Sequence, residues 1–298
     1  MKTIAILGPT ASGKTDLSIE LARQYGGVIL SLDSLSIYKE IDIASAKPTL
    51  HERAGIPHFG IDVVTPDKHF SVATFIDLFK EAKRYAETYG KHLFIVGGTS
   101  FYLKALTEGI SDIPPIDENV EAEVKKIVSN LSDAHKRLAS IDPIYTEKIA
   151  LNDRYRIEKG LQLYLQTGKE PSRYFAEHPP APIVRDLSLF EIGVERVELH
   201  QRIERRTASM IEAGLVDEVS ALEKRYGREP SAMKAIGIIE VLDYFDGKLS
   251  FGQMQERIVI HTRQLAKRQC TFNSTQFPPH PKLGRDELKE KISEVLER

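Results

Sequence analysis

The sequence predicts an α/β fold, in which a parallel sheet is flanked by helices and carries an all-helical insertion. Three observations lead to this prediction. Apolar runs typical of buried strands alternate with helix-patterned segments over the first hundred residues, a Gly-rich turn follows the first apolar run, and a charged stretch with few strand signals interrupts the pattern after residue 112. Strands that alternate with helices form parallel sheets with right-handed crossovers.

The first strand, turn and helix form the most specific of these features. Met1–Leu7 is interpreted as a buried strand with its apolar core at Ile4–Leu7, and Asp16–Tyr25 has helical periodicity. The turn between them matches the phosphate-loop pattern, which is Gly, four residues, Gly-Lys and a hydroxyl residue. In such a loop backbone N–H groups converge on phosphate oxygens, the lysine adds a positive charge and the hydroxyl suits Mg²⁺. The predicted polyphosphate ligands of this P-loop NTPase-like core are Gly8, Thr10, Ala11, Ser12, Gly13, Lys14 and Thr15, with Thr15 as the metal ligand.

Two further predicted strands end in polar or Gly-rich turns. Val28–Leu32 leads into Asp33-Ser34, and His92–Val96 leads into Gly97-Gly98-Thr99, with a helix expected over Phe75–Tyr89. Because ligands of parallel α/β sheets bind beyond the carboxyl ends of the strands, these turns and the phosphate loop are expected to meet at one site. Asp33 could bind a metal, cap a helix or act as a general base. The paired glycines indicate either a tight turn or a close approach to a ligand.

The remaining chain divides at two Pro-rich boundaries, Ile113–Ile116 and His178–Pro182. We expect a catalytic core made of residues 1–112 and 183–298, and a helical domain over residues 113–182. The expected elements are helices at Asp117–Leu131, Ser132–Ser140 and Asn152–Thr167, a strand at Leu187–Val194, and helices at Glu198–Tyr226 (broken near Gly214), Phe251–Phe272 and Asp286–Arg298.

Composition excludes several classes of protein. The chain has 298 residues, one cysteine (Cys270) and a net charge of −2. It therefore has no internal disulfide framework and no cysteine zinc site, and its nine histidines lack metal-ligand spacing. No apolar run approaches the ~18 residues of a membrane span, and the opening strand leaves no room for a signal peptide. A cytoplasmic protein is expected, and a nucleic-acid partner would need a local basic patch.

Two kinds of basic cluster could supply that patch. Arg202, Arg205 and Arg206 lie on one predicted helix, and Arg263, Lys267 and Arg268 lie on a later one. Such runs are either solvated faces or anion-binding surfaces. In the helical domain, Asp153-Arg154-Tyr155-Arg156 with Lys159 interleaves cations with an aromatic ring, which suits a nucleic-acid backbone and a stacked base. The alternative is a surface helix with a core tyrosine.

Taken together and in order, these segments resemble the tRNA dimethylallyltransferase family, also called tRNA isopentenyltransferases or IPP transferases. The resemblance runs over nearly the whole chain. Its blocks are Gly8–Thr15, Asp33–Tyr38 with Asp42-Ile43 and Ala46–Pro48, Ile56–Asp62, Val96–Thr99 with Tyr102, Asn152-Asp153 with Arg156 and Lys159, Met210 with Gly214-Leu215, Ala235–Gly237 with Glu240, and Gln264–Gln269 with Thr271.

The resemblance implies a reaction in which the phosphate loop holds a leaving group. The dimethylallyl group of dimethylallyl diphosphate would move to N6 of adenosine at position 37 of tRNA, giving N6-isopentenyladenosine and diphosphate. Lys14, Mg²⁺ on Thr15 and Arg206 would neutralise the diphosphate. Asp33 would be the base, and Thr99 would contact the adenosine or the leaving oxygen.

The same resemblance implies how tRNA is bound. The expected tRNA contacts are Asp33, Ser34, Leu35, Ser36 and Thr99 in the core, and Tyr155, Arg156 and Lys159 in an insertion that grips the anticodon stem-loop. The family usually has Gln at the positions of Ser36 and Tyr155 and often an aromatic residue at that of Ile238, so tRNA reading is expected to differ in detail. A monomer is expected. The competing hypotheses are an ATP-dependent small-molecule kinase, in which the insertion is a lid, and a non-catalytic tRNA-binding module.

Overall fold

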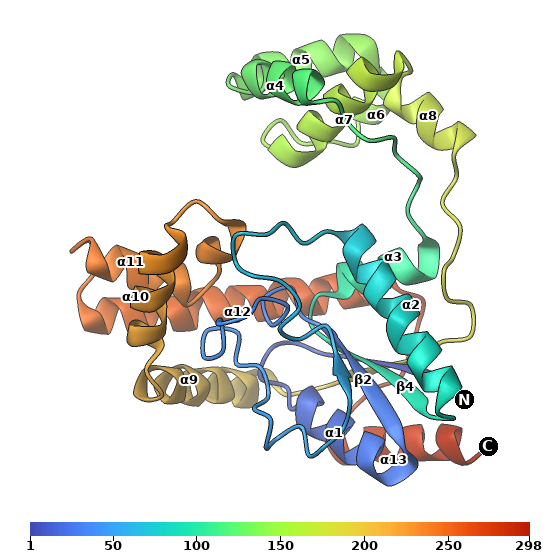
Figure 1. The fold of residues 1–298 in the computed structure, drawn as a ribbon, viewed down its shortest axis with the longest axis vertical. Helices are drawn as coiled ribbons and strands as arrows, with labels where there is room; N and C mark the ends of the chain where they lie inside the picture. Colours follow the sequence, from blue (N-terminus) through green and yellow to red (C-terminus); the bar gives the residue numbers. More distant parts are fainter. The chain divides into compact units, whose positions relative to one another are not determined.

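The computed structural model describes all 298 residues of the chain. Its contacts divide the chain into two compact units (Figure 1), one made of Met1–Lys104 with Val184–Arg298 and the other of Ala105–Ile183. The second unit begins at Ala105, earlier than the expected boundary at residue 113. It ends at Ile183, one residue after the expected boundary at residue 182. Each unit has its own hydrophobic core and is described by itself.

The first unit is built on a six-stranded sheet whose strands are all parallel, as the sequence predicted. The strand order is β3-β2-β4-β1-β5-β6, so β1 lies between β4 and β5. The strands are β1 (Thr3–Leu7), β2 (Gly27–Leu32), β3 (His58–Phe59), β4 (His92–Gly97), β5 (Ser188–Ile192) and β6 (Lys282–Leu283). Met1 and Lys2 are exposed and lie outside β1, which corrects the expected start of that strand.

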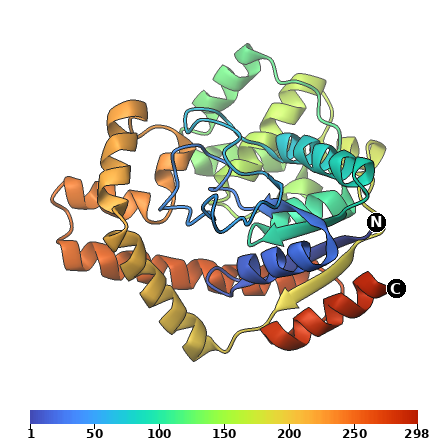
Figure 2. The ribbon, with the colours of Figure 1, turned by 60° about the horizontal axis from the view of Figure 1, so that its bottom comes forward.

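Successive side chains of each strand point to opposite faces of the sheet, and helices cover both faces. On one face, Ile4 and Ile6 of β1 and Phe94 of β4 pack with Leu17 of α1 (Lys14–Tyr25) and Leu288 of α13 (Arg285–Glu297). In Figures 1 and 2 these two helices lie together on one side of the sheet, and α2 (Val72–Thr88) covers the other side. Burial on both faces explains why these strands are continuous apolar runs in the sequence.

Further helices complete this unit beyond the carboxyl ends of the strands. The predicted break at Gly214 is confirmed, since this residue has φ 101° and separates α9 from α10. Ile203 of α9 and Ala266 of α12 are buried in one shared cluster, so the two helices pack against each other. These helices are α9 (Arg196–Glu212), α10 (Leu215–Tyr226), the 3-10 helix η1 (Ser231–Lys234), α11 (Ile238–Phe245) and α12 (Phe251–Gln276). Helix α3 (Ser100–Glu108) begins in this unit and ends in the second.

The second unit is entirely helical. Its core contains Val124, Leu138, Ile157 and Leu161. Its helices are α4 (Glu118–Ile127), α5 (Leu131–Ile141), α6 (Pro143–Thr146), α7 (Arg154–Thr167) and α8 (Pro171–Glu177). The side chains of Asp117, Asn130, Asp142 and Asp153 accept hydrogen bonds from the first turns of the helices that follow them, which fixes where α4 to α7 begin.

None of these helices combines the length and the apolar composition needed to cross a membrane.

Candidate active site

The phosphate loop joins β1 to α1. Ala11 (φ 63°) and Gly13 (φ 87°) adopt left-handed backbone conformations, and Gly13 directly precedes the helix. Such a turn points successive N–H groups into one concave space, and the first turn of α1 adds the positive end of its dipole. The hydroxyl of Ser12 is buried and has no hydrogen-bond partner within the protein. A phosphate oxygen would satisfy the Ser12 hydroxyl and the N–H groups of the first turn of α1, so the loop fits a polyphosphate. The N–H groups of Thr10 and Ser12 already have partners, because they donate to Gln269 Oε1 and to the carbonyl of Pro9.

Two cations converge on this loop. Lys14 Nζ donates a hydrogen bond to the carbonyl of Pro9 at 3.1 Å. Burial lowers the pKa of Lys14 to about 8, and the charge of Arg206 acts in the same direction while Asp33 opposes it. Burial also lowers the pKa of Arg206, again against the influence of Asp33. The protein thus holds positive charge in a place where water stabilises it poorly, and an anion with several negative charges would compensate for this.

Thr15 is exposed at the mouth of the loop. No group of three or more His, Cys, Asp or Glu side chains in the structure could hold a metal ion. A metal at Thr15 would therefore be bound by this hydroxyl, by phosphate oxygens and by water. That donor set fits Mg²⁺, which keeps several of its waters and is often bound through substrate phosphates.

The ends of β2 and β4 are tied together beside the loop. The N–H of Thr99 donates to the carbonyl of Leu32 at 2.9 Å, and Thr99 Oγ1 accepts from the N–H of Ser34 at 3.2 Å. Asp33 Oδ1 accepts from the N–H groups of Leu35 at 2.8 Å and Ser36 at 3.1 Å. The carboxylate of Asp33 is thereby fixed in orientation beside the hydroxyl of Thr99.

Neighbouring protein atoms leave no room for a side chain at Gly97 or Gly98. A Cβ on Gly97 would lie 2.2 Å from the carbonyl oxygen of Leu32, and one on Gly98 would lie 2.2 Å from Nε2 of Gln269. Gln269 Oε1 accepts from the N–H of Thr10 at 2.8 Å, and its Nε2 donates to the carbonyl of Gly98 at 3.1 Å. The close approach at these glycines is thus made by protein atoms, and neither glycine has a positive φ.

Gln269 was missed as a site residue by the reasoning from local patterns. It connects the phosphate loop to the turn that carries Thr99. A single amide on a basic helix gives no signal of its own, and only its place in the resemblance to a known family singled it out.

Two cavities meet at these residues. The phosphate cavity, of about 1430 Å³, is lined by the phosphate loop and by Arg202, Arg205 and Arg206. The strand-end cavity, of about 500 Å³, has a mixed lining of apolar and polar side chains, which include Asp33, Thr99, Lys234 and Arg268. Arg206 and Met210, one turn apart on α9, line both cavities. A ligand whose charged end lies at the loop would therefore reach the strand ends through this shared boundary.

Arg202 belongs to the phosphate cavity although only Arg206 of this cluster was predicted as a ligand. Its Nη1 donates to the carbonyl of Ser12 at 3.1 Å, and its Nη2 lies 2.6 Å from Glu198 Oε1. The expectation that Arg202 and Arg206 share a helix face is confirmed, because both line this cavity. Their face is an anion-binding candidate, since guanidinium groups pair well with phosphate oxygens.

The structure brings most, but not all, of the predicted site residues together. Gly13, Lys14, Thr15 and Arg206 line the phosphate cavity with Ala11 and Ser12, and Thr10, Asp33, Ser34, Leu35 and Thr99 line the strand-end cavity. Gly8, the first residue of the loop, lines neither cavity, and a Cβ on it would come within 2.8 Å of Ser12 Oγ. Ser36 lines neither cavity. It is buried, and its hydroxyl lies 3.2 Å from that of Ser31.

The remaining predicted residues lie on α7 in the helical unit. Tyr155 is 72% exposed, so the alternative that it is a core tyrosine is wrong. Arg156 is exposed and pairs with Asp153 at 3.5 Å, and Lys159 donates to Gln162 at 2.9 Å. All three side chains are therefore accessible on one helix.

Comparisons with known proteins agree with one another. A family model described as IPP transferase matches residues 36–276. The tRNA dimethylallyltransferase of Aliarcobacter butzleri is 51% identical over 93% of this chain and 93% of its own length. The full-length tRNA isopentenylpyrophosphate transferase of Bacillus halodurans superposes with a TM-score of 0.72 at 32% identity, over 99% of this chain and 97% of that one. A eukaryotic dimethylallyltransferase, described as acting on tRNA, gives a TM-score of 0.81 at 29% identity over 91% of this chain and 70% of that one.

Proposed function

Because the chain belongs to the IPP transferase family, a family of tRNA-modifying prenyltransferases, we propose that it transfers the dimethylallyl group of dimethylallyl diphosphate to N6 of adenosine at position 37 of tRNA. The products are N6-isopentenyladenosine and diphosphate. One observation carries this proposal: the phosphate cavity and the strand-end cavity share Arg206 and Met210, so a phosphate-binding loop and a carboxylate face one continuous site.

The phosphate cavity would stabilise the leaving group. As the C–O bond of the donor breaks, negative charge grows on the diphosphate. Lys14, Arg206 and the loop N–H groups are already held in place to receive that charge, which lowers the barrier without reorganisation. A bound Mg²⁺, held by Thr15, would supply further charge neutralisation.

The strand-end cavity would hold the acceptor. The exocyclic N6 of adenine loses a proton as it bonds to carbon, and the carboxylate of Asp33 would accept that proton. The two N–H groups that bind Asp33 Oδ1 fix the carboxylate in one orientation. Thr99 would contact the adenosine or the leaving oxygen from the adjacent strand end. The adenine must leave the anticodon stack to enter the cavity, at a cost of a few kcal/mol.

The helical unit would contribute contacts to the anticodon stem-loop. Tyr155, Arg156 and Lys159 offer an exposed aromatic ring and two cations on α7. Proteins recognise RNA loops by stacking on splayed bases and by contacts to the phosphate backbone. Ser34, Leu35 and Thr99 would contact the reacting nucleotide in the core. The burial of Ser36 argues against a direct contact of its side chain with a base.

The comparisons favour this function over the two competing hypotheses. The family model and all three relatives carry the names of prenyl-group transferases, and none is named as a kinase or as a non-catalytic binding protein. A kinase would need ATP as its phosphoryl donor, whereas the transferase uses a diphosphate that is already bonded to the transferred group.

One experiment distinguishes the three functions. The protein is incubated with Mg²⁺, dimethylallyl diphosphate labelled in its five-carbon group and unmodified tRNA with adenosine at position 37. Transfer of label to tRNA without ATP is expected, and it should be lost when that adenosine is replaced by guanosine. Binding of tRNA with no transfer of label would support the binding module, and a strict need for ATP would contradict the transferase.

A further inference from the structure

The segment Asp42–Pro48 lies between the two cavities. Asp42, Ile43, Ala46 and Lys47 line the phosphate cavity, whereas Ala44 and Ser45 line the strand-end cavity. We call this segment the partition. It contains no regular helix or strand, so its position depends on the side chains that hold it.

Glu218, in the first turn of α10, binds three successive N–H groups of the partition. Its Oε2 accepts from Asp42 at 2.9 Å and from Ile43 at 2.7 Å, and its Oε1 accepts from Ala44 at 2.9 Å. Three N–H groups that converge on one point form an anion-binding concavity. Here the anion is a side chain from a helix far away in the sequence, and Glu218 itself lines neither cavity.

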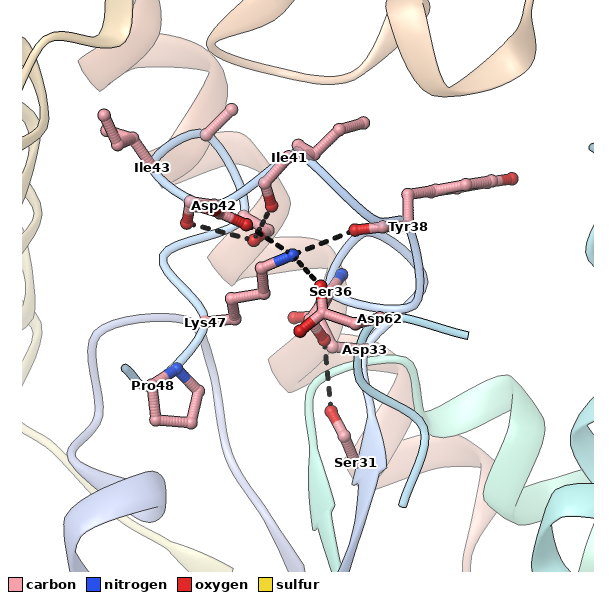
Figure 3. A network of polar contacts seen from close by, with 12 residues as sticks. Ser31, Asp33, Ser36, Tyr38, Ile41, Asp42, Ile43, Lys47, Pro48 and Asp62 are labelled. Carbon is pink, nitrogen blue, oxygen red and sulfur yellow. Dashed lines mark hydrogen bonds and ion pairs between the residues drawn. The ribbon is translucent and has the colours of Figure 1, made fainter. Parts of the chain in front are cut away.

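Lys47 holds the other end of the partition (Figure 3). Its side chain is 4% exposed, and Nζ donates to the carbonyl of Tyr38 at 3.0 Å, lies 2.7 Å from Asp42 Oδ1 and also contacts Asp62. The hydroxyl of Ser45 donates to the carbonyl of Ile41 at 2.5 Å. The partition is thus held by contacts among residues 38–62, and Glu218 connects it to α10.

The partition and α9 line the strand-end cavity together, through Ala44 and Met210. Both side chains lie near Gly237, since a Cβ built there would be 3.9 Å from Met210 Cε and 4.0 Å from Ala44 Cβ. Met210 lines both cavities, and Ala44 is buried. The N–H of this same Ala44 donates to Glu218, so Glu218 helps to fix the position of a residue that lines the strand-end cavity beside Met210.

We propose that Glu218 is a positioning residue. It fixes the position of the partition and thereby makes the site select a diphosphate donor with a short prenyl chain. This proposal rests on the proposed function, because it assumes a prenyl diphosphate in the phosphate cavity. With Glu218 in place, the partition and Met210 close around the five-carbon group. Without it, the partition relaxes, short donors are held less well, and longer chains find room beside Met210.

The test compares Glu218→Gln with Asp217→Asn. Both residues are acidic and lie in the first turn of α10, so the two variants lose the same interaction with the helix dipole, but Asp217 is exposed and binds no part of the partition. A glutamine cannot accept at both terminal atoms, so at least one of the three hydrogen bonds is lost. Steady-state transfer to tRNA is measured with dimethylallyl diphosphate and with geranyl diphosphate.

We expect Glu218→Gln to raise the KM for dimethylallyl diphosphate by about tenfold, as expected for a lost hydrogen bond to a charged group. The preference for the dimethylallyl over the geranyl donor, measured as a ratio of kcat/KM values, should fall by a similar factor. The KM for tRNA should change much less, because the helical unit is also proposed to bind tRNA, and Asp217→Asn should match the unsubstituted protein. Hydrogen exchange of the Asp42, Ile43 and Ala44 amides should be faster only in Glu218→Gln.

Two results would overturn the proposal. One is an unchanged donor preference in Glu218→Gln although the three amides exchange faster, and the other is an equal loss of activity in both variants. Failure of the unsubstituted protein to transfer any prenyl group to tRNA would instead contradict the proposed function, so the two failures are distinguishable.

Discussion

The side-chain amide of Gln269 accepts a hydrogen bond from the backbone N–H of Thr10 in the phosphate loop, at 2.8 Å. The other end of the same amide donates to the carbonyl of Gly98 at 3.1 Å. The amide therefore joins the loop proposed to hold the leaving group to the turn that carries Thr99. Only a group with one acceptor end and one donor end can make both bonds in this orientation.

The two hydrogen bonds of Gln269 predict different kinetic effects for two substitutions of this residue. Gln269→Glu keeps an acceptor for Thr10 but has no hydrogen to donate to Gly98, so kcat should fall about tenfold with a nearly unchanged KM for dimethylallyl diphosphate. Gln269→Met loses both bonds and should raise that KM as well. Gln264→Glu, which is exposed on the same helix, is the control for added charge. Identical kinetics for the Glu and Met variants of Gln269 would contradict this account.

Asp33→Asn tests the proposed base. Asparagine keeps an oxygen that can accept from the N–H groups of Leu35 and Ser36 but cannot take up a proton from N6. We expect kcat to fall by ~10²- to 10⁴-fold, the usual contribution of a general base, while the dissociation constant for tRNA stays within about twofold. Asp67→Asn, at an exposed carboxylate, should leave both unchanged. If Asp33→Asn kept most of its turnover, Asp33 would not be the base.

The lowered pKa of Lys14 predicts that diphosphate binding depends on pH. Its pKa is about 8 in the free protein, and a bound anion favours the protonated form and raises that pKa. Below pH 8 the lysine is already charged and binding needs no proton. Above pH 8 binding must take up a proton at Lys14, so affinity should fall by up to about tenfold per pH unit.

Calorimetric titration with inorganic diphosphate at pH 9, in buffers of different ionisation enthalpy, measures this proton uptake. Lys14→Arg is the matched control, because arginine keeps its charge throughout this range and any proton taken up by the ligand itself is common to both proteins. The unsubstituted protein should take up more protons than Lys14→Arg by nearly one. Equal uptake would mean that Lys14 does not titrate in this range.

Arg156→Ala tests the proposed RNA surface of the helical unit. Each phosphate neutralised by a protein cation releases counterions, so the loss of one contact should lower the slope of log affinity against log salt by about 0.7 to 0.9. Binding of tRNA at low salt should weaken as well. Lys136→Ala, which removes an exposed cation from α5 of the same unit, is the control. An unchanged slope for Arg156→Ala would remove this side chain from the interface.

The sequence predicted the fold wherever a long apolar run or a helical repeat carried the signal. The strand, loop and helix from Thr3 to Tyr25 and the break at Gly214 were predicted and are confirmed. The edge strands β3 and β6 were not, because each has two residues and exists only through its pairing with β2 or β5. Helix α3 was missed because it begins directly after the glycine turn, where the prediction ended.

The sequence predicted only those site residues whose position follows from neighbouring residues in the chain. The phosphate loop and Asp33 could be found from their place after a strand. The burial of Ser36 against Ser31, and the bonds from Glu218 to the partition, depend on how distant segments pack, which no local pattern encodes. The assignment of Asp33, Thr99, Arg156 and the other site residues to their roles stays a prediction.

Helix α13 covers the face of the sheet that also carries α1. Glu20 of α1 pairs with Arg285 and Lys289, and the Tyr25 hydroxyl donates to Glu297. During synthesis, β1 and α1 leave the ribosome long before β5 and α13, so this apolar face stays uncovered while the middle of the chain is made. The helical unit consists of one continuous stretch with local contacts and can form during that interval. The first unit, rather than the helical unit, is therefore the part of the chain that cannot bury its apolar face until the last helix has been made.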